Sequence, residues 1–266
     1  MANFEDKMVN PIIRNAMAKS AKLQENCVTY KGVMKKSGLF LLSFVLGAIL
    51  AIVIHALVPK TTYNNYAGTF SCSQAELILM IVTAVVGFVT CLIASFSYRS
   101  AAVCGTLACI CFGYPIGFCA AAIPAYQGPI LLALVLTVVL VGTLWVLYRT
   151  RVIKVSQKFK AFTMASILTI LIGALLLFIL SFIPATSAAV AWMYHNPAIS
   201  ITFGIIGVLI GCFFLLWDFD AVENAVTMGA DKKYENAIAF SLAFSVIYLY
   251  LKILQLIIRI MEVSRN

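Results

Sequence analysis

The sequence predicts an all-α protein of the membrane, and three observations lead to this class. Hydrophobic residues make up 63% of the chain and charged residues only 11%, with a mean hydropathy of +1.02, a balance far from that of water-soluble domains. The apolar runs are about 20 residues long, the length that crosses about 30 Å of hydrocarbon as a helix. None of the runs alternates like a barrel strand, and hydrocarbon leaves spanning backbone amides no partner outside a helix.

Seven apolar runs of this kind define seven candidate transmembrane helices in a polytopic bundle. They lie near 38–58, 77–97, 101–123, 129–148, 161–183, 199–217 and 237–260. This division gives a basic tail at 1–37, a helical domain at 38–261 and a short C-terminal tail at 262–266. Since the first run is too long for a signal-peptide core, we expect the tail to be retained.

The distribution of Lys and Arg predicts a cytoplasmic N-terminus, because cytoplasmic loops hold the excess of these residues. The tail, the connection at 148–160 and the turns after the second and sixth runs hold most of the cations, whereas the alternate loops hold only Lys60. Seven spans then place the C-terminus outside, where Arg259 and Arg265 run against the rule. A re-entrant last segment would also account for those two residues.

The net charge of +9 does not indicate a nucleic-acid partner, because its cations fall in loops that the topology requires to be basic. Those cations suit the headgroups of anionic lipids instead. Six of the eight cysteines lie inside apolar runs, where cysteine usually serves as a small hydrophobe. Neither a cofactor nor a nucleic-acid ligand is expected from these features.

Enzyme motifs are absent from the sequence. His55 and His195 are far apart, and the chain has no H-E-x-x-H pair, no phosphate-binding glycine loop and no G-x-S-x-G elbow. These absences argue against zinc hydrolysis, nucleotide use and serine hydrolysis. We therefore expect a protein that is not an enzyme.

Two pairs of glycines have the four-residue spacing that lets helices approach closely. The pairs are Gly113 with Gly117 and Gly207 with Gly211. Such rows more often pack helices within one bundle than form a dimer face, so we expect packing within the chain.

Carboxylates gather where the sixth apolar run ends. From Glu76 to Trp217 no further acidic residue occurs, and Asp218, Asp220 and Glu223 then follow within six positions. If the helix continues at about 100° per residue, Asp220 and Glu223 lie about 60° apart while Asp218 projects to the other side. Crowded carboxylates at a membrane mouth bind protons and attract hard cations such as calcium, with Asp218 the candidate ligand. The alternative is a solvated acidic connection between two helices.

Lys252 lies inside the last apolar run, although a lysine at the centre of a spanning helix costs roughly 2.5–3.5 kcal/mol on insertion scales. One explanation is an ion pair with Asp218. The other is that the side chain reaches the outer interface, since Lys252 is fifteen residues beyond Ala237, or about 22 Å along the axis.

The stretch from Val28 to Met261 resembles the Bax inhibitor-like family (transmembrane Bax inhibitor motif), in particular its YccA-like bacterial branch. The resemblance is carried by phrases spread over the chain in the family's order. They are Thr29-Tyr30-Lys31-Gly32-Val33, Ser95-Phe96 with Arg99, Leu147-Tyr148-Arg149, Val155-Ser156-Gln157-Lys158-Phe159, Asp218-Phe219-Asp220-Ala221-Val222-Glu223, Gly229-Ala230-Asp231-Lys232-Lys233-Tyr234 and Leu249-Tyr250-Leu251-Lys252-Ile253-Leu254.

The resemblance implies a bundle around a central seventh helix that passes cations, chiefly calcium, under the control of proton binding at buried aspartates. Asp218 matches the family's aspartate of the sixth helix, and Arg99 resembles the arginine that pairs with it. The second aspartate, in the seventh helix, is missing here, because no acidic residue occurs between Glu235 and Glu262. Residues 243–245 occupy its place.

These observations together predict a pH-sensitive calcium leak channel of the bacterial plasma membrane. In this hypothesis Asp218, Asp220 and Glu223 sense pH and gate the path, with Arg99 or Lys252 as counter-ion. The alternative is a non-conducting regulator that binds a membrane protease or another membrane protein through the basic tail.

Overall fold

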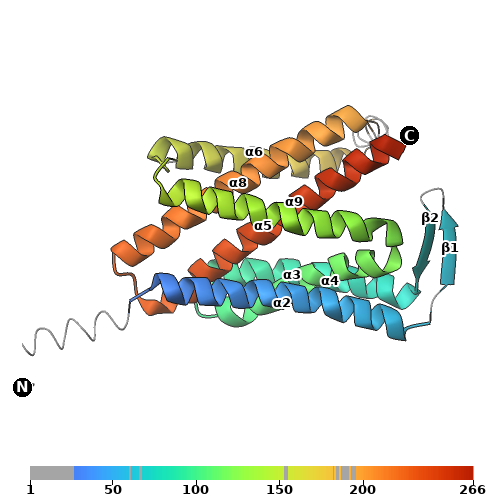
Figure 1. Cartoon of the computed structure of the whole chain (residues 1–266), viewed down its shortest axis with the longest axis horizontal. Coiled ribbons are helices and arrows are strands. Elements are labelled where there is room, and N and C mark those ends of the chain that lie inside the picture. The colour runs from blue at the N-terminus through green and yellow to red at the C-terminus, as the bar shows by residue number, and fades with distance from the viewer. Residues whose placement is uncertain are drawn as a thin grey trace, which may run out of the picture.

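In the part of the chain that it describes, the computed structural model has seven long helices and one short hairpin (Figure 1). It describes residues 27–59, 61–65, 68–152, 155–181, 183, 186, 192 and 196–265. The long helices are α2 (Tyr30–Leu57), α3 (Gln74–Phe96), α4 (Ala101–Ala122), α5 (Gln127–Arg149), α6 (Gln157–Ser181), α8 (Pro197–Thr227) and α9 (Glu235–Arg265). Two single turns of 3-10 helix, η2 (Pro124–Tyr126) and η3 (Lys232–Tyr234), precede α5 and α9. The predicted all-α class is therefore confirmed.

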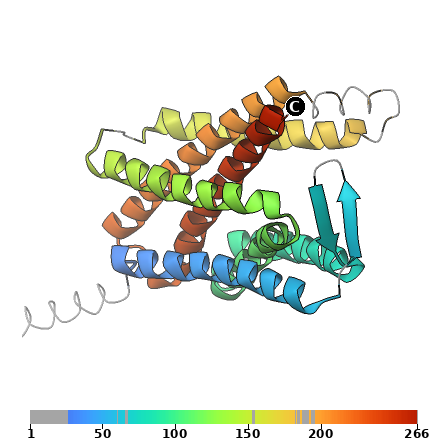
Figure 2. The same ribbon diagram turned by 45° about the vertical axis from the view of Figure 1, so that its right-hand side comes forward.

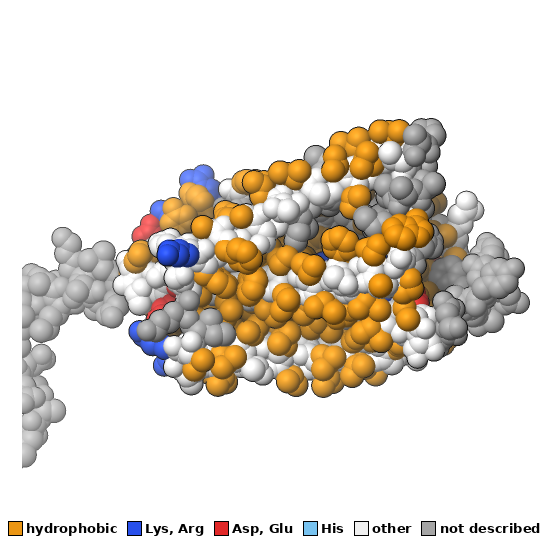
Figure 3. Space-filling view, turned by 90° about the horizontal axis from the view of Figure 1, so that it is seen from above, with side chains coloured by type: hydrophobic (Ala, Val, Ile, Leu, Met, Phe, Trp, Pro, Cys, Tyr) orange, Lys and Arg blue, Asp and Glu red, His pale blue; other side chains and the backbone are white. Residues whose placement is uncertain are grey.

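Within the described residues, six helical segments are long and apolar enough to cross a membrane. They are α2, α3, α4, η2 with α5, α8, and η3 with α9. The fifth predicted run forms α6, a helix of 25 residues that is not among these six. Figure 3 shows broad apolar surface along the bundle, with most of the visible charges gathered at one end. The chain is a multi-pass membrane protein.

Several helix boundaries differ from those predicted from the apolar runs. α2 begins at Tyr30, eight residues before the first run, because the Thr29 side chain caps it by accepting from the Gly32 amide at 3.1 Å. α8 continues ten residues past Trp217 and ends at Thr227, two residues before Gly229, which adopts the left-handed conformation (φ 64°) that follows many helix ends. The apolar runs mark only the lipid-facing part of each helix, and the polar turns at its ends extend the helix beyond the run.

The connection between α2 and α3 contains an antiparallel hairpin that the sequence analysis does not predict. Strands β1 (Thr61–Asn65) and β2 (Gly68–Cys72) pair from Thr61 opposite Cys72 to Asn65 opposite Gly68. The hairpin stands at one end of the bundle, and α2 begins at the opposite end (Figures 1 and 2). We call these the hairpin end and the Asp218 end, since α8 brings Asp218 to the latter.

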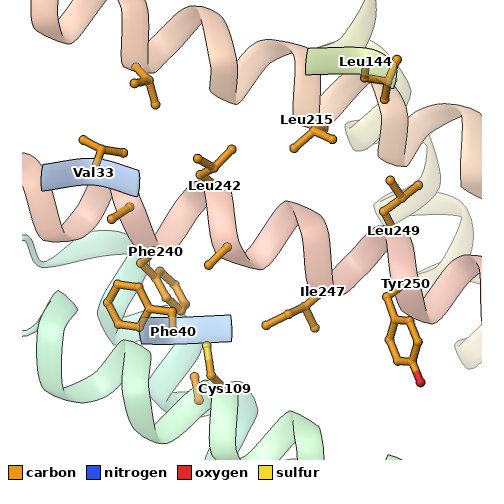
Figure 4. Packing of buried hydrophobic residues seen from close by; sticks show 14 of the residues in the cluster. Val33, Phe40, Cys109, Leu144, Leu215, Phe240, Leu242, Ile247, Leu249 and Tyr250 are labelled. Atoms are coloured by element: carbon orange, nitrogen blue, oxygen red, sulfur yellow. The ribbon is translucent and has the colours of Figure 1, made fainter. Parts of the chain in front are cut away.

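Helix α9 supplies much of the buried core. Its residues Leu242, Ala243, Ile247 and Leu249 are at most 5% exposed, and α9 contacts α2, α3, α4, α5 and α8. Figure 4 shows its side chains directed toward several neighbours, among them Phe40 of α2, which meets Phe240 edge to face at 5.6 Å between ring centroids. The buried side chains of α9 therefore join it to five other helices.

Glycines lie where two pairs of helices approach each other closely. A Cβ atom added at Gly113 or Gly117 of α4 would lie 2.0 Å from the carbonyl oxygen of Phe44 or Ala48 of α2. On α8, a Cβ at Gly207 would meet Lys252 at 3.1 Å, and one at Gly211 would meet Leu249 at 3.0 Å. All four predicted glycines thus lie at helix contacts within the chain.

Candidate functional site

Asp218 lies in the last third of α8 and faces α9. The hydroxyl of Ser241 donates to Asp218 Oδ1 at 2.7 Å, and the hydroxyl of Ser245 donates to Oδ2. The two serines are four residues apart, so they lie one above the other on the same face of α9. Both carboxylate oxygens are therefore bound by neutral donors, which tie the ends of α8 and α9 together.

Asp220 and Glu223 point away from α9 toward other helices. Lys160 of α6 contacts Asp220 Oδ2 at 2.5 Å, and Asn224 donates to the same oxygen at 2.7 Å. Glu223 accepts from the phenol of Tyr148 in α5 and lies 3.7 Å from Arg151. The helical spacing explains the division, because 200° separates Asp218 from Asp220. The structure does not bring the three predicted carboxylates into one site.

Two further carboxylates of this end also have cationic partners. Asp231 pairs with Lys233 at 2.6 Å, and Glu235, which is 1% exposed, pairs with Lys36 of α2 at 2.9 Å. Of the five acidic residues between 218 and 235, Asp218 is the one that has no Lys or Arg within 4 Å in the described part of the chain. Its negative charge is the one left uncompensated at this end.

Neither predicted counter-ion contacts Asp218. Arg99 is exposed in the turn between α3 and α4, where its guanidinium lies 5.8 Å from the centroid of the Tyr98 ring. Lys252 lies further along α9, with its amine 3.3 Å from Gln255 Oε1 and 5.6 Å from the Tyr248 ring centroid. The methylenes of Lys252 cover Gly207 of α8. The expected ion pair of Asp218 with either cation is not present in this structure.

The chemistry around Asp218 limits what the site could hold. Three or more His, Cys, Asp or Glu residues placed to bind a metal occur nowhere in the described residues. Asp218 offers one carboxylate beside two hydroxyl groups, whereas a stable calcium site needs six to eight oxygens. Such a donor set suits a proton or a cation in passage better than a permanently bound ion.

A second buried polar pair joins α2 to α3 at the hairpin end. His55 Nδ1 lies 2.8 Å from Glu76 Oε1, and the two residues are 4% and 1% exposed. The other carboxylate oxygen of Glu76 accepts from the Ser73 amide at 2.8 Å and so also caps α3. Phe118 of α4 packs edge to face on the imidazole at 6.1 Å.

Sequence reasoning missed the two serines and both buried pairs. Ser241 and Ser245 have the four-residue spacing that places hydroxyl groups on one face of a helix, and that spacing was the available signal. His55 with Glu76 and Lys36 with Glu235 had weaker signals, because each pair joins different helices. A buried acid in an apolar run does call for a partner.

Comparison with known proteins identifies the family. A search of curated proteins finds no match for the chain. The family model described as Bax inhibitor 1 like matches residues 10–262, almost the whole chain. This protein is therefore a member of the Bax inhibitor 1 like family.

Proposed function

We propose that this protein is a pH-sensitive leak for cations, with calcium as the carried ion and Asp218 as the group that senses protons. The observation that supports this proposal is the uncompensated charge of Asp218 among four neighbouring carboxylates that all have cationic partners. Membership of the family is consistent with it. Asp220 and Glu223 then fasten α8 to α6 and α5 instead of sensing pH.

The hydrogen bonds of Asp218 suggest how a proton would act. Ionised Asp218 accepts from Ser241 and Ser245, and such charge-assisted bonds are about twice as strong as neutral ones. A proton on the carboxylate removes the charge and one acceptor, which weakens the tie between α8 and α9. We therefore propose that the ionised form is closed and that acidification opens a path between these helices.

The proposed leak also requires a particular arrangement of the helices in the membrane. We propose that α6 also crosses the bilayer, so that seven helices surround or include a central α9, in a bacterial plasma membrane with the N-terminus in the cytoplasm. The exposed cations at the Asp218 end support this orientation and suit anionic lipids. They include Lys31, Lys35, Arg99, Arg151 and Lys233.

Replacing Asp218 by Asn should remove the pH response. In liposomes that contain the purified protein, calcium uptake should be greater at pH 6 than at pH 8. Asp218→Asn should raise uptake at pH 8 by about tenfold, because a bond to a charged group worth roughly 1.5–3 kcal/mol is lost. Uptake by this variant should then be equal at both pH values.

The matched control is Asp220→Asn, which removes a carboxylate from the same helix but one that already has a lysine partner. This variant should keep the difference between pH 6 and pH 8. The mechanism is wrong if Asp218→Asn responds to pH like the unaltered protein. Uptake no greater than that of empty liposomes under both conditions would exclude the leak itself.

A second candidate function is that of a regulator that does not conduct and binds a membrane protease or another membrane protein. The observation in its favour is that the part of the basic tail just before α2 is fixed to the connection between α8 and α9. The Val28 amide donates to the Ala230 carbonyl at 2.8 Å, and Cys27 pairs with Asp231 in an antiparallel bridge. A partner on the tail would thus act close to Asp218.

Deletion of residues 1–26 separates the two candidates. A leak should conduct as before without these residues, since the proposed path lies between α8 and α9. A regulator should lose its effect on the partner, measured as the activity of that partner in membranes that contain the full or the shortened chain. Loss of calcium uptake after this deletion would contradict the leak as proposed.

A further inference from the structure

The start of α2 holds the start of α9 through a buried carboxylate that the proposed function leaves unexplained. Glu235 is the first residue of α9 and is 1% exposed. Lys36 donates to its Oε2 at 2.9 Å, and the hydroxyl of Thr29 donates to its Oε1 at 3.4 Å. One turn further along, Ser37 donates to the carbonyl oxygen of Ala239 at 2.9 Å.

Together with Thr29 and Lys36, Gly32 forms the socket on α2 that holds the Glu235 carboxylate. A Cβ atom at this position would lie 1.5 Å from Glu235 Oε1 and 2.6 Å from its Cδ. No side chain other than that of glycine leaves space for the carboxylate. This explains three residues at the start of α2, because the capping Thr29, the small Gly32 and the basic Lys36 all lie against the same acid.

About one and a half turns of α9 connect the socket around Glu235 to the Asp218 site. Ser241 is six residues beyond Glu235, or about 9 Å along the axis of α9. Helical hydrogen bonds make this segment stiff, so the position of Glu235 fixes that of the Ser241 hydroxyl. A displacement of the first turn of α9 would change the bond from Ser241 to Asp218.

We propose that Glu235 is a positioning residue for Asp218: its socket on α2, formed by Thr29, Gly32 and Lys36, sets where the Ser241 hydroxyl meets the carboxylate. The inference rests on the proposed role of Asp218 as the proton-binding group. It adds that the start of α2 controls this group without touching it.

Other titratable groups at this end have partners of their own. Tyr148 and Arg151 contact Glu223 from the side of α5, and Lys160 contacts Asp220 from α6. On the side of α9 the contacts of Asp218 are the two serines. A change confined to the α2 socket therefore leaves the contacts of Asp220 and Glu223 in place.

The test measures protonation of Asp218 directly, without ion flux. A hydrophobic carbodiimide modifies protonated carboxyl groups, and mass spectrometry then gives the modified fraction of Asp218 as a function of pH. Gly32→Ala should push Glu235 out of its socket and weaken the bond from Ser241. Asp218 should then stay protonated to a pH about one unit higher, since hydrogen bonds favour the ionised form.

Gly38→Ala is the matched control, because it adds the same methyl group to the same helix at a position with nothing within 4 Å. Its modification curve should coincide with that of the unaltered protein. Ser241→Ala should shift the midpoint as Gly32→Ala does, and combining the two should add little further shift. Coincidence of the Gly32→Ala curve with the control curve would overturn the inference.

Lys36→Gln provides a second route if Gly32→Ala fails to fold. This variant removes the charge from the socket without adding bulk, and it should shift the midpoint in the same direction by a smaller amount. An unchanged midpoint in Lys36→Gln would also overturn the inference. Absence of calcium uptake together with a shifted midpoint would reject the leak but retain the positioning role.

Discussion

Gly113→Ala should destabilise the protein by about 3 kcal/mol or more, the upper part of the range for overpacked sites. The added Cβ would lie 2.0 Å from the carbonyl oxygen of Phe44, and that oxygen belongs to the backbone of α2. The helices cannot separate locally, because a Cβ atom added at Gly47 of α2 would likewise lie 2.1 Å from the carbonyl oxygen of Ile110 in α4. Thermal unfolding of the purified protein in detergent measures the loss.

Gly142→Ala is the matched control for this substitution. Gly142 lies within α5, and a Cβ atom there would have nothing within 4 Å. Since alanine favours a helix over glycine by about 1 kcal/mol, this variant should unfold at the same temperature as the unaltered protein or slightly higher. Equal unfolding temperatures for Gly113→Ala and Gly142→Ala would contradict the close approach of α2 and α4.

His55→Ala should destabilise the protein by about 3 kcal/mol, the upper part of the range for leaving a buried polar group without its hydrogen-bond partner. The substitution leaves the Glu76 carboxylate 1% exposed and without the imidazole at 2.8 Å. The Ser73 amide remains on the other oxygen but cannot replace the lost partner. The same unfolding measurement gives the effect.

An exposed pair provides the comparison for His55→Ala. Arg259 and Glu262 of α9 are 3.2 Å apart and about half exposed, so Arg259→Ala should change stability by less than about 1 kcal/mol. The double variant His55→Leu with Glu76→Gln should lose less stability than His55→Ala, because no charge remains buried. If His55→Ala and Arg259→Ala lower the unfolding temperature equally, burial does not determine how much the His55 pair contributes to stability.

Much of the fold could be predicted from the sequence because hydrocarbon imposes helices of a set length. Six of the predicted runs correspond to helices that could cross a membrane, and the remaining run, the fifth, forms α6. The hairpin at 61–72 was not predicted, since its short polar strands carry no apolar pattern. The start of α2 was placed eight residues late because Lys31, Lys35 and Lys36 lower the hydropathy of its first turns without interrupting the helix.

The candidate site was predictable only where it depends on a single helix. Spacing along α8 separates Asp218 from Asp220 and Glu223, and the structure has this arrangement. The partners from other helices depend on how the bundle packs, which local spacing does not determine. For this reason Ser241 and Lys160 were not identified, and Arg99 does not contact Asp218.

Membrane insertion of α9 depends on the helix before it. Alone in a bilayer, α9 would expose Lys252 to lipid, at a cost of roughly 2.5–3.5 kcal/mol near its centre. The lysine methylenes are covered by Gly207 of α8, and its amine meets Gln255. Because that cover comes from α8, the two helices should enter the bilayer together as a helical hairpin. The short connection at 228–234 permits this, so we expect α8 and α9 to insert as a pair.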